Sequence, residues 1–237
     1  PIVWEDRVFI TTAVATDQVA PAPQSAGEPS EEGRRGRRGG RLGQAAPTQV
    51  YEFKVYCLDR ETGKVVWEKT ANKTVPHEGL HATNTYASAS PITDGKHLWV
   101  FFGSYGLYCY DLAGNDVWQR DLGDMRTRAG FGEGASPALY EDTLVVNWDH
   151  EGQSFITAID ALTGDDKWKV DRDESTTWVT PLVVEGAGKV QVIVNASNRV
   201  RSYDLANGEV IWECGGQVGN PIPTPVVLDG VAYCMTG

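Results

Sequence analysis

Short apolar runs that alternate with polar residues recur along the whole chain, and each pair of runs follows a proline. These prolines are Pro1, Pro91, Pro137, Pro181 and Pro225. The polar turn between two runs suits a tight hairpin where it contains Asp-Gly, because glycine tolerates positive φ. The alternation has a period of two residues, and no helical period persists. The pattern therefore predicts a series of β-hairpins.

The last four of these prolines are 46, 44 and 44 residues apart, so the hairpins belong to a longer repeat. Four of the five prolines follow a hydroxyl-bearing residue: Ser90, Ser136, Thr180 and Thr224. The first spacing of 90 residues is longer because residues 17–49 hold mostly Pro, Gln, Ser, Gly, Glu and Arg. That composition predicts a disordered insertion between two strands of the first repeat.

A second motif lies out of phase with the prolines. It reads A-x-D-x-x-T-G-x-x-x-W at Ala158–Trp168 and returns in altered form at Cys57–Trp67, Cys109–Trp118 and Ser202–Trp212. Its Asp can accept backbone N–H bonds in a turn, its Gly supplies a left-handed residue, and its Trp offers an apolar face to a neighbouring repeat. The predicted structural residues are Asp59, Gly63, Trp67, Asp111, Trp118, Asp160, Gly164, Trp168, Asp204, Gly208 and Trp212.

A period in the mid-forties with four strands per repeat is typical of propeller blades. We therefore expect an all-β chain of four-stranded antiparallel blades, in which the strands of each blade are labelled A to D in chain order. The blades are predicted at about 1–76, 77–127, 128–172 and 173–216, with the A–B hairpin of a fifth at about 217–237. Four blades and a hairpin do not close a ring. The chain is expected to be part of a seven- or eight-bladed propeller whose remaining blades lie elsewhere in the full-length protein.

The net charge of −11 argues against a body that binds nucleic acid or anionic lipid non-specifically. The insertion carries an Arg-rich run at 33–41, which is either a solvated loop or an arm that binds polyanions. The insertion has a net charge of +1 and the rest of the chain −12, so the arm could equally rest on its own acidic body. No apolar run reaches the 18 residues of a membrane-spanning helix.

The four cysteines form no C-x-x-C pair and have no metal-ligand spacing. Cys57 and Cys109 occupy the motif position of Ala158, which predicts small, buried, free thiols. Cys214 and Cys234 could approach each other, but nothing in the sequence demands a disulfide. Cysteine usage therefore does not indicate a redox compartment.

The motif copies resemble the tryptophan-docking motif of the PQQ (pyrroloquinoline quinone)-like β-propeller repeat proteins. That superfamily includes the quinoprotein alcohol dehydrogenases and the outer-membrane β-barrel assembly lipoprotein. The resemblance covers nearly the whole chain apart from 17–49, and phrases such as 147–152 and 212–216 resemble a planctomycete-type bacterial branch. The resemblance implies a propeller in which the motif holds adjacent blades together. It also implies export to the periplasm or cell envelope and participation in a membrane-associated assembly.

The quinoprotein dehydrogenases also carry adjacent cysteines, a Ca²⁺ site of Glu, Asn and Asp, and a catalytic Asp. This chain has no Cys-Cys pair, and its residues do not match the Ca²⁺ site one by one. The expected function is thus a non-catalytic binding or scaffolding module without a resident cofactor. The alternative is a PQQ- and Ca²⁺-dependent alcohol dehydrogenase-like enzyme, and an adaptor joined to an enzymatic domain elsewhere is a third hypothesis.

The segment His77–His81 matches the zinc-peptidase signature H-E-x-x-H, which requires a helix that presents both His on one face. Pro76 precedes it and Gly79 lies inside it, and the residues that follow suit a loop and strand. No third ligand is evident. We interpret the segment as a loop between blades and predict no metal site and no catalytic residue.

In a propeller, the loops from strand D to the next strand A and from strand B to strand C gather at one mouth of the channel. Such concave places are where ligands usually bind. The polar and aromatic residues of these loops either hold a small-molecule or protein ligand or bond to one another and close the channel. They are His81, Asn84, Tyr86, Tyr105, Arg128, Glu133, Trp148, Asp149, His150, Asp173, Glu174, Trp178, Asn198, Arg199 and Asn220.

Overall fold

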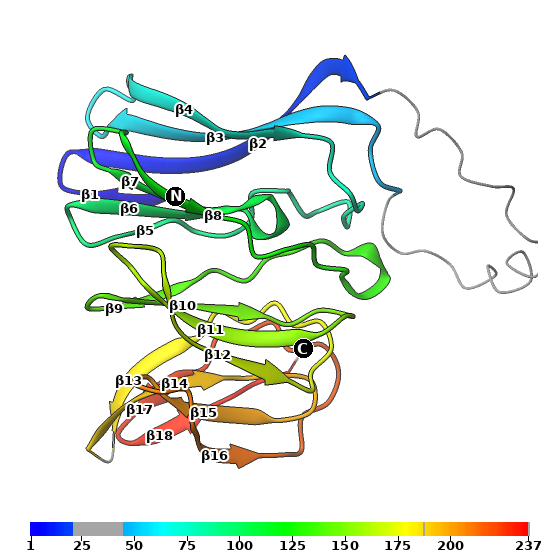
Figure 1. Ribbon diagram of the computed structural model, residues 1–237, viewed down its shortest axis with the longest axis vertical. Helices are drawn as coiled ribbons and strands as arrows, with labels where there is room; N and C mark the ends of the chain where they lie inside the picture. The colour runs from blue at the N-terminus through cyan, green and yellow to red at the C-terminus, as the bar shows by residue number, and fades with distance from the viewer. Residues whose placement is uncertain (21–44, 187, 237) are drawn as a thin grey trace, which may run out of the picture.

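The computed structural model describes residues 1–20, 45–186 and 188–236. Four four-stranded antiparallel sheets follow one another along the chain, and a two-stranded hairpin comes last (Figure 1). The first sheet contains β1 (Ile2–Trp4), β2 (Arg7–Val19), β3 (Gln49–Asp59) and β4 (Val65–Thr74). The second contains β5 (Ile92–Thr93), β6 (His97–Phe101), β7 (Leu107–Asp111) and β8 (Asp116–Arg120).

The third sheet contains β9 (Ala138–Tyr140), β10 (Thr143–Trp148), β11 (Ser154–Asp160) and β12 (Asp166–Arg172). The fourth contains β13 (Leu182–Gly186), β14 (Lys189–Val194), β15 (Val200–Asp204) and β16 (Val210–Cys214), and the hairpin contains β17 (Val226–Leu228) and β18 (Val231–Tyr233). In every sheet the strands pair in chain order. The predicted all-β fold of four blades and one A–B hairpin is thus confirmed.

The blades stack with the same orientation, so their turns gather at two opposite ends. Figure 1 shows the short A–B and C–D turns on the left and the longer B–C and D–A loops on the right. Each sheet lies within one of the ranges predicted from the repeats. The predicted boundaries between blades, which lie within the connecting loops, stay predictions.

The predicted insertion at 17–49 is too wide at both ends. Strand β2 continues to Val19, which pairs with Gln49 at the start of β3. The antiparallel ladder therefore extends beyond the point where the composition changes. Residues 21–44, which include the Arg-rich run, lie outside the described residues.

The C–D turns are closed by the motif Asp and Gly. In the first blade, the Thr62 N–H donates to Asp59 Oδ1 at 2.7 Å, and the Gly63 N–H donates to the Asp59 carbonyl at 2.9 Å. The Thr62 hydroxyl also donates to Asp59 Oδ1, at 2.6 Å, and this bond together with that of the Thr62 N–H holds the pKa of Asp59 below its ordinary value. Gly63 has a φ of 68°, which favours glycine because a Cβ strains the left-handed region.

A register shift lies at the same place in strand C of every blade, between the first and second residues of the motif. In the third blade, Ala158 pairs with Trp168, and the shift follows between Ala158 and Ile159. The equivalent pairs are Cys57 with Trp67, Cys109 with Trp118 and Ser202 with Trp212. The first motif position is therefore small because it lies opposite the tryptophan. Cys57 and Cys109 are buried as expected, and burial raises the pKa of the Cys109 thiol to about 12.

The motif tryptophans of the first three blades join each of these blades to the turn of the next. The Nε1–H groups of Trp67, Trp118 and Trp168 donate to the carbonyls of Leu112, Ala161 and Leu205, at 3.0, 2.9 and 2.7 Å respectively. Each acceptor directly follows the motif Asp of the neighbouring blade. The turn glycine lies beneath the indole, so that a Cβ on Gly164 would lie 2.8 Å from the Trp118 ring.

The hydroxyl residues before the prolines form a second set of contacts between blades. The Ser90 N–H donates to Ser136 Oγ at 2.9 Å, and the Ser136 N–H donates to Thr180 Oγ1 at 3.1 Å. Because proline has no N–H, the preceding amide is the donor available at the start of strand A. This accounts for the hydroxyl residues at positions 136 and 180, which accept these bonds.

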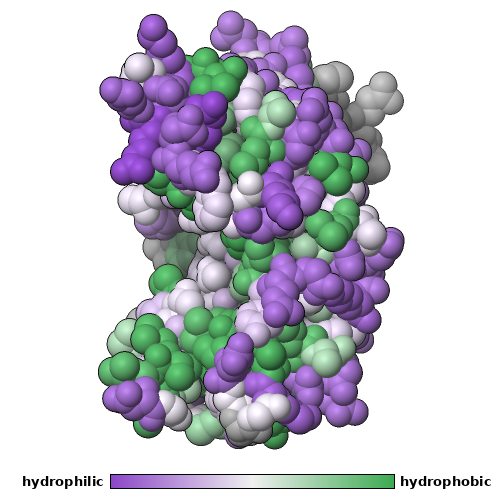
Figure 2. Space-filling model, turned by 90° about the vertical axis from the view of Figure 1, so that its left-hand side faces the viewer, coloured by the Kyte–Doolittle hydropathy of each residue, from purple (hydrophilic) through white to green (hydrophobic). Residues whose placement is uncertain are grey.

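The apolar core lies between adjacent sheets. One cluster joins the first and second sheets around Phe9, Phe53 and Leu98, a second joins the second and third, and a third joins the third and fourth. Apolar side chains of the final hairpin, such as Leu228 and Tyr233, remain exposed. In Figure 2, which faces the short-turn end, apolar residues accordingly gather in the lower part of the molecule.

Because a tryptophan stacks on the turn of the next blade, a Gly→Ala substitution should reduce the unfolding free energy more in a turn that carries an indole than in one that does not. Gly164→Ala places a methyl group against Trp118 and strains a φ of 80°, so we expect a loss of about 2–4 kcal/mol in unfolding free energy. Gly63→Ala is the matched control, since its φ is 68° but no atom lies within 4 Å of the added Cβ. It should cost about 1–2 kcal/mol. Equal losses in denaturant unfolding would contradict the stacking.

Candidate functional site

A small cavity lies at the end of the stack where the long loops meet. The β4–β5, β8–β9 and β12–β13 loops surround it together with β10 and a 3-10 turn at Gly103–Tyr105. The cavity volume is about 30 Å³, enough for a few atoms or water molecules. Five of the residues predicted for the channel mouth line it: Tyr86, Tyr105, Glu133, Asp149 and Trp178.

Asn147, near the end of β10, is a deeply buried polar residue of this cavity, with 2% exposure. Its Nδ2–H₂ donates to Asp149 Oδ2 and to Thr177 Oγ1, both at 3.1 Å. Because the Asp149 carboxylate can only accept, the orientation of the Asn147 amide is fixed. The Asn147 Oδ1 atom has no hydrogen-bond partner among the described residues. Such an unpartnered acceptor is uncommon in protein interiors.

Glu133 reaches the cavity from the β8–β9 loop. Its carboxylate accepts bonds from the Ser104 N–H at 2.8 Å and from the Ser104 hydroxyl at 2.5 Å. Burial nevertheless raises the pKa of Glu133 to about 7, and the Ser104 hydrogen bonds only partly oppose this rise. The group therefore titrates near neutral pH.

The H-E-x-x-H segment adds a second carboxylate to the cavity. Residues 77–81 lie in the β4–β5 loop, as expected from their sequence. Glu78 accepts from the Thr127 N–H at 2.9 Å and lines the cavity, whereas His77 Nε2 contacts the Met125 carbonyl at 2.7 Å. His81 Nδ1 contacts the hydroxyl of Thr83 at 2.9 Å. The side chains of His77, Glu78 and His81 thus each contact a different protein group.

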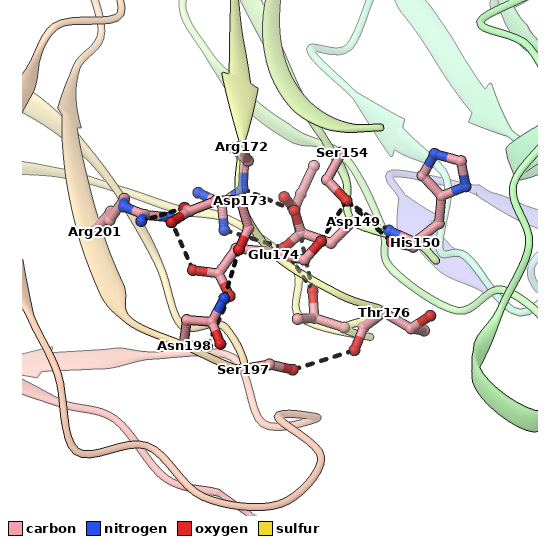
Figure 3. Close-up of polar contacts among 12 residues, drawn as sticks. Asp149, His150, Ser154, Arg172, Asp173, Glu174, Thr176, Ser197, Asn198 and Arg201 are labelled. Atoms are coloured by element: carbon pink, nitrogen blue, oxygen red, sulfur yellow. Dashed lines mark hydrogen bonds and ion pairs between the residues drawn. The ribbon is translucent and has the colours of Figure 1, made fainter. Parts of the chain in front are cut away.

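Asp149, the third carboxylate, belongs to a buried ion pair. Arg172 Nε donates to Asp149 Oδ1 at 2.7 Å, Arg172 Nη2 donates to Asp149 Oδ2 at 3.0 Å, and both side chains are fully buried. Arg172 also donates to the Tyr203 hydroxyl on the neighbouring sheet. Figure 3 shows the bonds between Asp149 and Arg172. The pair lies within the third blade, and the bond from Arg172 to Tyr203 crosses the seam to the fourth.

A second polar group lies next to this pair. Arg201 Nη1 donates to Glu174 Oε1 at 2.8 Å, and another Nη group of Arg201 donates to Asp173 (Figure 3). The Asn198 N–H donates to Glu174 Oε2 at 2.7 Å. Desolvation raises the pKa of Glu174 despite these donors. Asp173, Glu174 and Asn198 are therefore bound to neighbouring protein groups.

Several other predicted mouth residues also bond across the seams. Arg128 Nη1 donates to Asn220 Oδ1 at 2.6 Å, which joins loops 92 residues apart in sequence. Asn84 Nδ2 donates to the Phe131 and Glu133 carbonyls at 2.9 and 3.1 Å. Trp178 Nε1 donates to the Gly132 carbonyl at 2.8 Å. These bonds hold the loops of successive blades in one arrangement.

The remaining predicted residues lie away from the cavity. Trp148 is 2% exposed and stacks on Phe155 in the core between the second and third sheets. His150 is also buried, and its Nδ1 accepts from the Arg126 N–H at 3.1 Å. Arg199 pairs with Glu213 on the surface. As ligand contacts, these residues stay predictions.

No described residue that lines the cavity is Lys, Arg or His. Within 1–20, 45–186 and 188–236, no group of three or more His, Cys, Asp or Glu side chains is placed to hold a metal ion. The same part of the chain contains no helix long and apolar enough to cross a membrane. The lining therefore combines carboxyl and amide groups with hydroxyl groups and aromatic side chains.

Comparisons with known proteins agree with the propeller fold. The sequence model of the PQQ_2 family, described as outer membrane protein assembly factor BamB, matches residues 3–148 and 51–232. Among solved structures, BamB from Moraxella catarrhalis has 14% identity and a TM-score of 0.51 over 82% of this chain and 55% of that one. The computationally designed Ika8 protein has 11% identity and a TM-score of 0.51 over 77% and 51% of the two chains.

The quinohemoprotein alcohol dehydrogenase from Comamonas testosteroni has 13% identity and a TM-score of 0.47, over 81% of this chain and 39% of that one. No curated protein matches the chain. At these identities the structural likeness shows the fold alone. The chain spans about half the length of the BamB structure.

The buried ion pair predicts a large loss of stability when one partner is removed. Asp149→Asn leaves Arg172 buried without its counter-charge, and we expect unfolding free energy to fall by about 3–5 kcal/mol. Arg199→Ala removes one partner of an exposed pair and should cost less than about 1 kcal/mol. Urea unfolding measures both changes. A loss of under 1 kcal/mol in Asp149→Asn would show that this pair is not buried in solution.

The raised pKa of Glu133 predicts that this residue destabilises the fold as pH rises. Its contribution to stability is fully present below its ordinary pKa of 4.5 and is lost as pH rises through about 7. Glu133→Gln keeps an acceptor for Ser104 but does not titrate. Its stability relative to the wild type should increase by up to about 3 kcal/mol between pH 4.5 and 8. A constant difference across this range, measured by urea unfolding, would contradict the assignment.

Proposed function

We propose that this chain, which belongs to the PQQ_2 family described as outer membrane protein assembly factor BamB, is a non-catalytic binding or scaffolding propeller of the bacterial cell envelope. Its ligand or protein partner binds at the end of the stack where the B–C and D–A loops gather. The family description supports the envelope location. Since the chain spans about half of the matched BamB structure, the remaining blades would complete the channel.

The observation that carries the proposal is the preorganisation of the mouth loops. Arg128 joins Asn220, Asn84 joins the Phe131 and Glu133 carbonyls, and Trp178 joins Gly132, each across a blade seam. Loops that are already held in place lose little conformational freedom when a partner binds. A rigid concave surface with polar and aromatic groups is suited to recognition.

PQQ fits this mouth poorly, which supports a binding or scaffolding role over quinone-dependent oxidation. PQQ is a flat tricyclic compound with three carboxyl groups, and the cavity measures about 30 Å³, well below the roughly 300 Å³ of a typical ligand pocket. The lining carries the carboxyl groups of Glu78, Glu133 and Asp149, and no described lining residue is basic. A tricarboxylate would meet like charges there. The sequence also lacks the adjacent cysteines of the quinoprotein dehydrogenases.

The alternative of a PQQ- and Ca²⁺-dependent oxidoreductase predicts an opposite outcome in a reconstitution experiment. The full-length protein is incubated with PQQ and Ca²⁺, desalted, and assayed for quinone absorbance and for dye-linked alcohol oxidation. We expect neither signal above that of a buffer control. Retained quinone together with alcohol oxidation would replace the binding proposal with the enzymatic one.

Site-specific photocrosslinking tests where a partner binds. A crosslinking residue replaces Thr83 in the β4–β5 loop at the mouth, or Thr62 in a C–D turn at the opposite end; both positions are exposed. In cells that express the full-length protein, we expect a discrete adduct from position 83 and none from position 62. Adducts from position 62 alone, or from both positions equally, would show that the mouth is not the binding surface.

A further inference from the structure

The cavity behind the mouth contains a buried hydrogen-bond acceptor to which no described residue donates. Asn147 Oδ1 is buried at the cavity wall without a donor among the described residues. The acceptors of Glu78 and Glu133 face the same cavity. Each of these carboxylates already receives bonds from a backbone N–H and a hydroxyl, at Thr127 and Ser104 respectively.

The cavity lining also carries negative charge that the described residues do not fully compensate. Of the three carboxyl groups in its lining, Asp149 alone has an ion-pair partner in the described part of the chain, Arg172. A water molecule would satisfy Asn147 Oδ1 but would leave the negative charge uncompensated. A positively charged donor would do both. Charge-assisted hydrogen bonds are about twice as strong as neutral ones.

Aromatic side chains complete the environment. Tyr86 and Tyr105 are in edge-to-face contact, with ring centroids 5.9 Å apart, and Trp178 lines the cavity with them. Aromatic faces attract cations, particularly where water is excluded. A cavity of about 30 Å³ accommodates a small head group rather than a large molecule.

We propose that this cavity binds the head group of a small primary ammonium ion, with Asn147 Oδ1 and the Glu133 and Glu78 carboxylates as acceptors and the aromatic side chains around it. The inference rests on the proposed function, because it names the ligand class of the same mouth. A primary ammonium offers three N–H donors and one positive charge. Unlike a metal ion, a primary ammonium ion does not need a set of metal-ligating side chains.

The ionisation of Glu133 links this binding to pH. With a pKa of about 7 the group is largely neutral at pH 5.5 and largely charged at pH 8. The groups facing it are the Ser104 hydroxyl and amide and Tyr105 from the 3-10 turn, and His77 and Glu78 from the β4–β5 loop. Since a cation favours the carboxylate, affinity should rise with pH through about 7 and binding at pH 6 should release a proton.

The test is calorimetric titration of the full-length protein with methylammonium chloride at pH 8. Methanol is the matched neutral probe, because it has the same number of heavy atoms without the charge. We expect saturable methylammonium binding that is at least about 10-fold tighter than that of methanol, as a charge-assisted bond implies. Potassium chloride at the same concentration controls for ionic strength. Equal affinity for methylammonium and methanol would overturn the inference.

Variants locate the binding. Glu133→Gln should weaken methylammonium binding about 10-fold at pH 8 and remove most of its pH dependence, while Glu61→Gln, which removes a charge from an exposed C–D turn, should change neither. Asn147→Leu should also weaken binding at least about 10-fold in protein that still unfolds cooperatively. Unchanged affinity in Glu133→Gln would overturn the inference even if Asn147→Leu failed to fold. Photocrosslinking at position 83 is independent of this result, so a failed ammonium site and a failed binding mouth are distinguishable.

Discussion

The fold depends on one repeated contact, the indole of a strand-D tryptophan lying on the C–D turn of the next blade. In the first three blades the indole packs over a turn glycine of the next blade and donates to a carbonyl of that turn, as Trp168 does to Leu205. Truncation of such a buried aromatic residue typically costs about 3–5 kcal/mol. The other features of the repeat follow from it: a small residue opposite the indole, a left-handed glycine beneath it, and an Asp that closes the turn.

The same stacking creates the mouth at the opposite end of the blades. Because every blade is held in the same orientation, the long loops converge, and their polar groups bond across the seams, as Arg128 does with Asn220. The cavity among them combines aromatic faces with an excess of acceptors, including the unpartnered Asn147 Oδ1. We propose that its size and charge favour recognition of a small donor over a quinone tricarboxylate. The acidic character of the whole chain, with a net charge of −11, is in keeping with a cationic ligand.

The fold could be predicted from the sequence because its signals are local and repeated, such as prolines 44 to 46 residues apart and the Asp-Gly-Trp motif. The site could be predicted only in part. Loop position predicted Tyr86 and Glu133 at the mouth, and both line one cavity, but it also included Trp148, whose indole lies in the core near the end of β10. Asn147 was missed because its unpartnered oxygen results from bonds to Asp149 and to Thr177, 30 residues away. No periodic pattern records such a long-range arrangement.

The central claim is that contacts between blades hold the mouth loops in place before anything binds. Hydrogen exchange in the ligand-free full-length protein, followed by NMR, tests it most directly. We predict that the Thr127 and Ser136 amides, which donate to Glu78 and Thr180, exchange as slowly as the indole N–H groups of Trp118 and Trp168. Fast exchange of these amides beside slowly exchanging indoles would contradict the claim, because the blades would then be stacked while the mouth remained unformed.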